Sequence, residues 1–443
     1  MKKEFGDIAR LFLGISAEYF EEQNGFETRS SQGVFSSIAV VWLSIQQRLS
    51  HQSLSAALTE AQASILEDPI FQKNTKSRRV RFGQISSNTG GLSRARTRTC
   101  VEFFQGLIAS CTPAIFKSVP LSDSPVYVLD GQVCSMASTD SNAAGFGRHK
   151  ANNRKLHYPK VRTVCAHQLS TGLALEPAIG TMHDSEVTLA IDHILPQLPR
   201  GSLIVGDRGY DTRRFACEAY QRGVEVLVRL TDKMARSITG GKLPSGRCSE
   251  KEVSWSPSVY ELSHKIADGS EPPVTGRVIR FTAESKGFRS KSFLFFTTSS
   301  KPLDEIAQLY RQRVQVEVFI RQLKQTLKLF FIRAKTEENV HKEILIAYLT
   351  FNLLRATMSD FATSLGIDVT RLSFTKTLDL CRAFAPYLYN EQDAASRQST
   401  LGRMKTALAQ AKLPLRKKPR SYPREIKLSK ASKYALNPWY EGK

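Results

Sequence analysis

The sequence predicts an α/β protein in which a helical N-terminal region precedes a sheet-containing core, and three observations carry that prediction. Apolar residues recur at helical spacing through the first hundred or so residues, with no strand pattern among them. From Pro125 onward, short apolar runs that end in Asp or Gly alternate with helical segments. Residues 231–290 lose this alternation and hold Gly-Gly, Pro-Pro and serines around two strand-like runs, which indicates a β-rich insertion.

The charge balance points to a polyanionic partner. Among 443 residues, Lys and Arg number 63 against 41 Asp and Glu, which gives a formal net charge of +22. So large a basic excess makes nucleic acid the leading expectation. A merely solvated basic surface is the alternative that charge alone leaves open.

Cysteine usage and hydropathy indicate the compartment. The seven cysteines include no C-x-x-C pair and their number is odd, which favours reduced thiols over a disulfide framework or a zinc site. The longest apolar run, residues 34–45, is short and interrupted by serines, and no apolar leader follows the first residues. We therefore expect a cytoplasmic protein with no membrane partner.

These patterns divide the chain into five parts. We expect a helical N-terminal DNA-binding domain at residues 1–120, followed by a core whose two parts span residues 121–230 and 291–390. The β-rich insertion separates them at residues 231–290. Residues 391–443 are expected to form a basic C-terminal tail, since the Arg-, Lys- and Pro-rich stretch from Leu415 cannot bury a core.

A basic segment within the N-terminal region is the first candidate for contact with DNA. Residues 73–98 contain eight basic residues and no acidic one, around a Ser/Asn/Gly turn at residues 86–91. The pattern restarts as a helix at Leu92, so Arg94 and Arg96 are predicted to lie on an ordered basic helix that binds DNA. A solvated linker is the alternative interpretation.

The order of elements in the core is typical of a ribonuclease H-like fold. Three strands, a helix, a strand, a helix and a strand follow one another. The strands are expected at residues 126–129, 161–169, 174–179, 203–205 and 224–230, and the helices at residues 186–195 and 211–223. After the insertion, residues 293–296 resume a buried strand, Pro302 opens a long helix, and a second helix is expected at about residues 338–363.

Two aspartates follow apolar strands in this order. Asp130 ends the run VYVL, and Asp207 ends the run LIVG. Because a sheet exposes side chains to ligands at the carboxyl ends of its strands, two such carboxylates make half of a metal site. An Asp in this position is more often a turn or helix cap, so the pair needs a third residue. Glu186, at a predicted helix start, is interpreted as a partner of the helix dipole and not as a catalytic acid.

The third carboxylate stands in a row of polar side chains on the helix after Pro302. At about 100° per residue, four residues fall within about 60° of one another: Tyr310, Arg313, Glu317 and Lys324. A neighbouring apolar stripe would seat the helix on the sheet. A carboxylate flanked by two cations and a phenol suits a metal ion held beside a phosphate. A solvated amphipathic face is the alternative.

The spacing of this row resembles the Y-R-E-K signature of the insertion sequence four family of bacterial DDE transposases. The resemblance extends to Asp130 in VYVLDGQ, to Asp207 in LIVGDRGY and to the insertion, and it covers about residues 125–363. Gly131 and Gln132 depart from the family pattern, in which a small hydroxyl residue more often follows the first Asp.

The resemblance implies a metal-dependent active site. Asp130, Asp207 and Glu317 would hold two Mg²⁺ or Mn²⁺ ions, which activate water or a 3′-hydroxyl group and stabilise the leaving oxygen. The expected partners are the terminal inverted repeats of an insertion sequence and a target DNA. A homodimer is expected in the synaptic complex.

The resemblance also assigns contacts with DNA. Tyr310 and Arg313 would grip phosphates near the cleaved end, and Lys324 the terminal phosphate. Trp255 is the only tryptophan between the second Asp and the Glu, and it is expected to receive a base displaced during hairpin formation. Its place beside Val253 in an alternating run also fits a residue that fills a small core.

The expected reaction is nicking at the terminal repeats, release of the element by hydrolysis or hairpin formation, and strand transfer into target DNA. Two alternatives stay open. A ribonuclease H-like nuclease or resolvase would cut without joining, and a DNA-binding regulator would carry a defunct core. The complete set of three carboxylates argues against the regulator.

Overall fold

The computed structural model describes residues 34–50, 53–64, 88–119, 124–151, 154–264, 272–283, 291–390 and 394–414. Within these ranges, the residues that precede the sheet form four helices: α2 (Ser37–Ser50), α3 (Leu54–Ser64), α6 (Gly90–Arg98) and α7 (Val101–Lys117). The helical restart predicted at Leu92 is confirmed by α6. Most of the basic segment, residues 73–87, lies outside the described residues.

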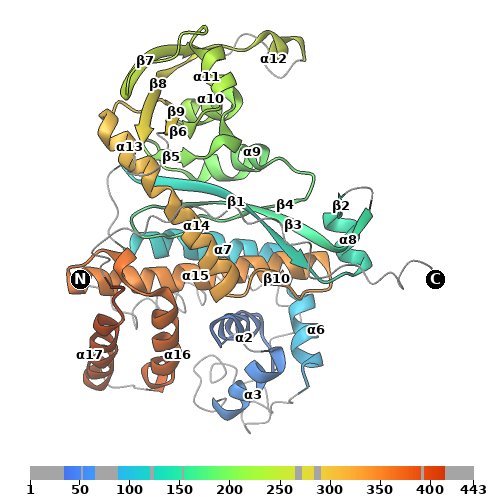
Figure 1. Ribbon diagram of the computed structural model, residues 1–443. Helices are drawn as coiled ribbons and strands as arrows, with labels where there is room; N and C mark the ends of the chain where they lie inside the picture. The colour runs from blue at the N-terminus through green and yellow to red at the C-terminus, as the bar shows by residue number, and fades with distance from the viewer. Residues whose placement is uncertain are drawn as a thin grey trace, which may run out of the picture.

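A mixed sheet forms the centre of the molecule (Figure 1). Its strands, in the described part of the chain, are β1 (Val126–Met136), β2 (Arg148–Ala151), β3 (Arg154–Gln168), β4 (Ala178–Thr181), β5 (Leu203–Gly206), β6 (Glu225–Arg229), β7 (Cys248–Trp255), β8 (Val274–Ala283), β9 (Lys291–Thr297) and β10 (Phe331–Ile332). Their order is β2-β3-β1-β5-β6-β9-β8-β7, while β4 pairs with β3 and β10 pairs with β1. The pairs β1–β5, β5–β6 and β1–β10 are parallel, and the other pairs are antiparallel.

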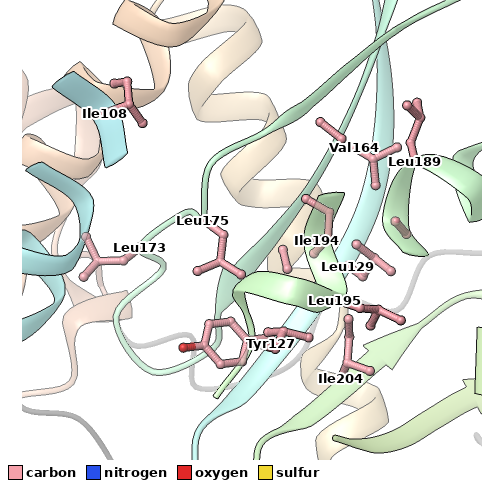
Figure 2. Close-up of a cluster of buried hydrophobic side chains, with 14 of the residues drawn as sticks. Ile108, Tyr127, Leu129, Val164, Leu173, Leu175, Leu189, Ile194, Leu195 and Ile204 are labelled. Atoms are coloured by element: carbon pink, nitrogen blue, oxygen red, sulfur yellow. The ribbon is translucent and has the colours of Figure 1, made fainter. Parts of the chain in front are cut away.

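Strand β1 separates two hydrophobic cores because successive side chains point to opposite faces of a strand. Tyr127 and Leu129 belong to one core, and Figure 2 shows them beside Ile204 of β5 and the helical residues Ile194 and Leu195. This core includes α9 (Glu186–Leu189), the π-helical turn η1 (Ala190–Ile194), the 3-10 turn η2 (Leu195–Gln197) and α10 (Arg213–Gln221).

The even-numbered residues of β1 face the other core. Val128, Cys134 and Met136 are buried there with Val316 and Phe319 of the helix that follows Pro302. Asp130 is an even-numbered residue as well, so the alternation directs it to the face that this helix covers. The position of the first aspartate follows from the pleat of one strand.

The long helix α15 (Glu337–Leu365) connects the sheet to the N-terminal helices. Its 29 residues span roughly 44 Å at about 1.5 Å per residue. Thr336 caps its start by accepting from the amide of Asn339, and Gly366, with φ 62°, ends it in the left-handed conformation. The helix contacts α7, α2 and α6, which lie below the sheet in Figure 1. The prediction of a long helix from about residue 338 to residue 363 is confirmed.

The insertion is joined to the main sheet by hydrogen bonds. Strands β7 and β8 form an antiparallel pair, β8 pairs with β9, and β9 pairs with β6. Two short helices accompany them, α11 (Asp232–Ile238) and α12 (Val259–Ser263). The residues between the two aspartate-bearing strands and Glu317 therefore extend the central sheet at its edge and do not form a sheet of their own.

Three predicted elements need correction. The first strand was expected to end before Asp130, but β1 continues to Met136, because residues 130–135 go on pairing with β3. The helix after Pro302 is interrupted, and it consists of α13 (Leu303–Gln312), α14 (Val314–Arg321) and the π-helical turn η4 (Gln322–Thr326). Residues 394–410 of the predicted tail form helix α17 (Ala394–Gln410), whose Leu401, Met404 and Leu408 pack into the second core because they recur at helical spacing. Residues 415–443 lie outside the described residues.

The remaining described elements are α8 (Asp140–Phe146), the 3-10 turns η3 (Arg208–Tyr210) and η5 (Val369–Arg371), and α16 (Phe374–Asn390). Among the described helices, none is by itself long and apolar enough to cross a membrane. Among the described helices, α6 and α7 would reach the length and apolar composition of a membrane span only if they were taken together, and a bend of 78° separates them.

Candidate active site

The two aspartates lie at matching positions on neighbouring parallel strands. Val128 of β1 is paired with Val205 of β5, so Asp130 and Asp207 each follow two residues later. The parallel direction brings both carboxylates to the same level, just beyond the point where the pairing of β1 with β5 ends, although β1 itself continues to Met136. Asp207 also caps the turn η3, where its side chain accepts a hydrogen bond from the amide of Gly209 at 2.7 Å.

Arg313 links the first aspartate to the predicted third carboxylate. It lies at the junction of α13 and α14, and its guanidinium nitrogens are 3.8 Å from Oδ2 of Asp130 and 3.7 Å from Oε1 of Glu317. The Glu317 side chain is 56% exposed, so it can move without disturbing the core. The structure thus gathers two residues of the Y-R-E-K row around the carboxylate at the end of the VYVL run.

Asp130 is the carboxylate whose environment most opposes ionisation. Burial raises its pKa to about 6, and the charges of Asp207 and Glu186 act in the same direction. The amide of Gly131 and the guanidinium of Arg313 act in the opposite direction. The neighbouring carboxylates thus add negative charge around Asp130, and Arg313 partly offsets it.

Tyr310 lies on the same side of the sheet. Its ring packs on Phe295 with 4.4 Å between centroids, and the guanidinium carbon of Arg313 is 5.8 Å from its ring centroid. Burial is the main reason why the pKa of the Tyr310 phenol is raised, and the nearby charge of Asp207 raises it further while Arg313 and Arg229 lower it. The phenol therefore stays protonated and can donate a hydrogen bond at the rim of the site.

Lys324 lies in an irregular part of the helix, so its place in the row stays a prediction. The row assumed a regular helix, whereas residues 322–326 form a π-helical turn, in which each turn holds about one more residue. The charge of Lys324 acts on the Cys134 thiol, four residues beyond Asp130 along β1.

The donor set fits a hard divalent cation. Asp130, Asp207 and Glu317 offer carboxylate oxygens, the ligands that Mg²⁺ prefers, and the described residues place no histidine or cysteine among them. Within the described part of the chain, no three acidic, histidine or cysteine side chains lie close enough together to hold one ion. The reason is visible at Arg313, whose positive charge stands between two of the three carboxylates.

Glu186 is the residue that sequence reasoning missed. Its carboxyl group fills the space that a β-carbon on Gly131 would occupy, and its charge acts on both Asp130 and Tyr210. Glu186 is also 3.8 Å from the Nε of Arg162. It does begin helix α9, as predicted, but it is a fourth carboxylate beside the site as well. In the sequence, the one indication of this contact was that Gly131 departs from the family pattern after the first Asp.

Trp255 is buried, with 5% of its surface exposed. Its ring meets Phe296 edge to face, with centroids 4.9 Å apart, so it fills the small core of the extended sheet. This arrangement is that of a packing residue, and any capture of a base would require the side chain to leave that contact.

The two arginines predicted on the basic helix differ in their surroundings. Arg94 is exposed on α6, whereas Arg96 is half-buried against the core, and its Nε has no hydrogen-bond partner within the described residues. Burial lowers the pKa of Arg96, and the charges of Glu343 and Arg48 also act on it. Arg96 therefore lies in a cluster of charges at the junction between the N-terminal helices and the sheet.

Comparison with known proteins gives two matches. A family model described as the transposase DDE domain matches residues 121–353, a range that contains both aspartates and Glu317. The chain is also 28% identical over 312 residues to the transposase InsG for insertion sequence element IS4 of Escherichia coli (strain K12). That alignment covers 68% of this chain and 67% of the relative.

Proposed function

This chain belongs to the DDE transposases of the insertion sequence four family, and from that premise we propose that it cleaves the terminal inverted repeats of an insertion sequence and joins them to target DNA. The observation that carries the proposal is the meeting of Asp130, Arg313 and Glu317 from two distant parts of the chain. Members of such a family act on DNA and use divalent metal ions.

A ribonuclease H-like core is part of the proposal. The order β4-β3-β1-β5-β6 supports it, because the first three strands are antiparallel while β5 and β6 run parallel to β1. The described helices α2, α3, α6 and α7 would belong to an N-terminal domain that binds the repeats. The insertion would then be a part of the same core, because its strands continue the sheet beyond β6.

Asp130, Asp207 and Glu317 are proposed to hold two Mg²⁺ or Mn²⁺ ions. When bound, the ions supply an activated water or 3′-hydroxyl group and stabilise the leaving oxygen. Glu317, which is 56% exposed, would turn away from Arg313 to complete the donor set. Arg313 would then be free to bind a phosphate beside the scissile bond, because a guanidinium group pairs well with phosphate oxygens.

The remaining residues of the signature are proposed to orient the DNA end. Tyr310 keeps its proton because of burial, so its hydroxyl group can donate to a phosphate oxygen near the cleaved bond. Lys324, in the π-helical turn η4, would bind the terminal phosphate. Release through hairpins would need Trp255 to leave its contact with Phe296 and stack on a displaced base.

The test is a reaction with both element ends and a target plasmid in one tube. The purified chain with Mg²⁺ is expected to nick the ends and to produce joined products, resolved on a gel. Cleavage without any joined product would favour a nuclease or resolvase. Cross-linking of the complex formed with two ends is expected to yield a homodimer, and a monomer would contradict that part of the proposal.

A further inference from the structure

A cavity of about 560 Å³ lies where the N-terminal helices meet the sheet, away from the carboxylates. Helices α2, α3 and α6 form one wall, and the turn after η4, strand β10 and helix α15 form the other. Its volume falls within the range of about 300–1,000 Å³ that is typical of sites for small ligands. A single nucleotide can enter such a space, whereas a duplex can only lie across its mouth.

The walls of this cavity are strongly basic. The cations that line it are Arg48, Arg96, Lys328 and Arg333. The one carboxylate among the described lining residues is Glu343, and its oxygens accept from Arg48 and from the amides of Arg333 and Ala334. The charge of Glu343 is therefore already paired within the protein, and the net positive charge of the lining can attract an anion.

Arg48 fixes the shape of the cavity. Besides pairing with Glu343, its guanidinium group lies within hydrogen-bond reach of the carbonyl oxygens of Leu327 and Lys328, at 3.3 and 3.5 Å. Lys328 has φ 58°, the left-handed region that non-glycine residues rarely adopt. Such a conformation persists only when the surroundings hold it, and it is most often found at functional sites.

Arg96 supplies a donor that the protein does not use. Its Nε is buried and has no hydrogen-bond partner among the described residues. A buried donor without a partner costs about 1–3 kcal/mol, so the Arg96 side chain is not held in place by a bond at this nitrogen, and its guanidinium group lines the cavity where a phosphate could bind. Arg333 directly follows β10 and is exposed. It places a second positive charge on the opposite wall of the cavity.

An aromatic ring completes the features that a nucleotide requires. Phe330 lines the cavity, and 56% of its surface is exposed, so its ring is accessible to a ligand. Leu54 and Leu327 extend the apolar part of the lining. A base can stack on such a ring while the sugar-phosphate reaches the arginines.

The cavity is aligned with the carboxylates by strand β1. Phe331 of β10 is paired with Ser135, which lies five residues beyond Asp130. Five residues span roughly 16 Å at about 3.3 Å per residue, a distance that a short stretch of unpaired nucleotides can cover. Cys134 of β1 lies between the two places, and the charges of Lys324 and Arg48 both act on its thiol.

We propose that this cavity binds one unpaired nucleotide of the DNA strand that runs on from the cleaved end, with Phe330 stacked on the base and Arg96 and Arg333 holding the phosphate. The inference rests on the proposed function, because that function supplies the DNA. A free nucleotide has the same chemistry, and the experiment below separates the two sources.

The experiment uses the full chain carrying Asp130→Asn in EDTA, so that binding is measured without cleavage. The probes are a duplex of arbitrary fixed sequence with a five-nucleotide single-stranded overhang that carries 2-aminopurine, and the same duplex fully paired. The overhang is expected to bind more tightly than the paired duplex and to show quenched 2-aminopurine fluorescence. Phe330→Ala should remove the quenching and weaken overhang binding roughly tenfold or more.

The controls match each change in chemistry. Tyr220→Ala removes an aromatic side chain of similar exposure, 49%, on α10, and Lys117→Gln removes a cation outside the cavity. Neither control should alter the quenching, while Arg333→Gln should weaken overhang binding. Phe330→Leu should retain stability but not quenching, which separates stacking from folding.

Three outcomes would overturn the proposal. They are equal binding of overhang and duplex, quenching that persists in Phe330→Ala, and competition by dAMP at concentrations equal to the overhang, which would assign the cavity to a free nucleotide. Failure of the proposed function is a separate result: the parent chain in Mg²⁺ would then neither nick nor join DNA, while the quenching in EDTA would remain.

Discussion

The carboxyl group of Glu186 occupies the space that a β-carbon on Gly131 would fill. The two residues are 55 positions apart, and they meet because Gly131 faces the α9 side of β1 while Asp130 faces α14. The missing side chain at position 131 thus admits a fourth negative charge next to Asp130.

Gly131→Ala is therefore expected to displace Glu186 and to lower the free energy of unfolding by roughly 1–3 kcal/mol, the usual cost of overpacking. Urea unfolding measures the effect, and adding Glu186→Ala in the same chain should restore most of the loss. Gly402→Ala is the matched control, because nothing lies within 4 Å of its added β-carbon. If both glycine variants have the same free energy of unfolding, the contact between position 131 and Glu186 does not affect stability.

Removing any one of the three carboxylates should separate cleavage from binding. We expect Asp130→Asn, Asp207→Asn and Glu317→Gln each to slow nicking at least about 10²- to 10³-fold, the scale on which loss of a group that stabilises the transition state is felt. Binding to the ends should change little, because phosphate contacts supply most of the affinity. A nicking assay on a gel measures cleavage, and a mobility-shift assay measures binding. If the Glu317→Gln variant nicks DNA at the parent rate in Mg²⁺, Glu317 is not part of the active site.

The stability of the metal-free chain should depend on pH through Asp130. Its pKa is raised to about 6 in the folded protein, so its contribution to stability is full below about pH 4 and is lost as the pH rises through 6. Asp130→Asn is expected to match the parent at pH 4 and to exceed it above pH 6, by at most about 3 kcal/mol.

Urea midpoints in EDTA between pH 4 and pH 8 measure this difference. Mg²⁺ should then raise the midpoint of the parent at pH 7 and leave Asp130→Asn largely unchanged. A difference between parent and variant that stays constant across the pH range would contradict the origin in Asp130.

Trp255→Ala is expected to destabilise the chain by about 3–5 kcal/mol, because it deletes a buried aromatic ring. Trp255→Phe should preserve the contact with Phe296 and most of the stability. Thermal unfolding measures the packing role, and a hairpin assay measures the capture of a base. If the Phe variant is as stable as the parent yet forms hairpins much more slowly, the indole ring acts on DNA as well as in the core.

Local pattern was enough to predict the apolar runs that precede Asp130 and Asp207 and the helical segment that carries Glu317, but not that β1 continues past Asp130 to Met136. Apolar runs are properties of neighbouring residues, and parallel pairing then brings the carboxylates together. The contact between Gly131 and Glu186 could not be predicted in the same way, because it depends on which face of β1 a distant helix covers.

The joining of the insertion to the main sheet was out of reach for a similar reason. The pairing of β9 with β6 links residues about 70 positions apart, and strand patterns carry no record of their partners. The irregular helix around Arg313 and Lys324 was missed because no Gly or Pro marks it. Its π-helical turn arises where the chain must reach β10.

The π-helical turn at residues 322–326 has a consequence for how this protein can change over generations. Such a turn holds one residue more than the corresponding turn of an α-helix, so it can be regarded as an α-helix into which one residue has been inserted. Deleting that residue would restore a regular helix and leave the later side chains in their present orientation, whereas a deletion in the regular helix α14 would rotate them by about 100°. Strand β10 would keep its alignment with β1, and lineages of this protein should therefore tolerate a single-codon deletion in this turn more readily than one in α14.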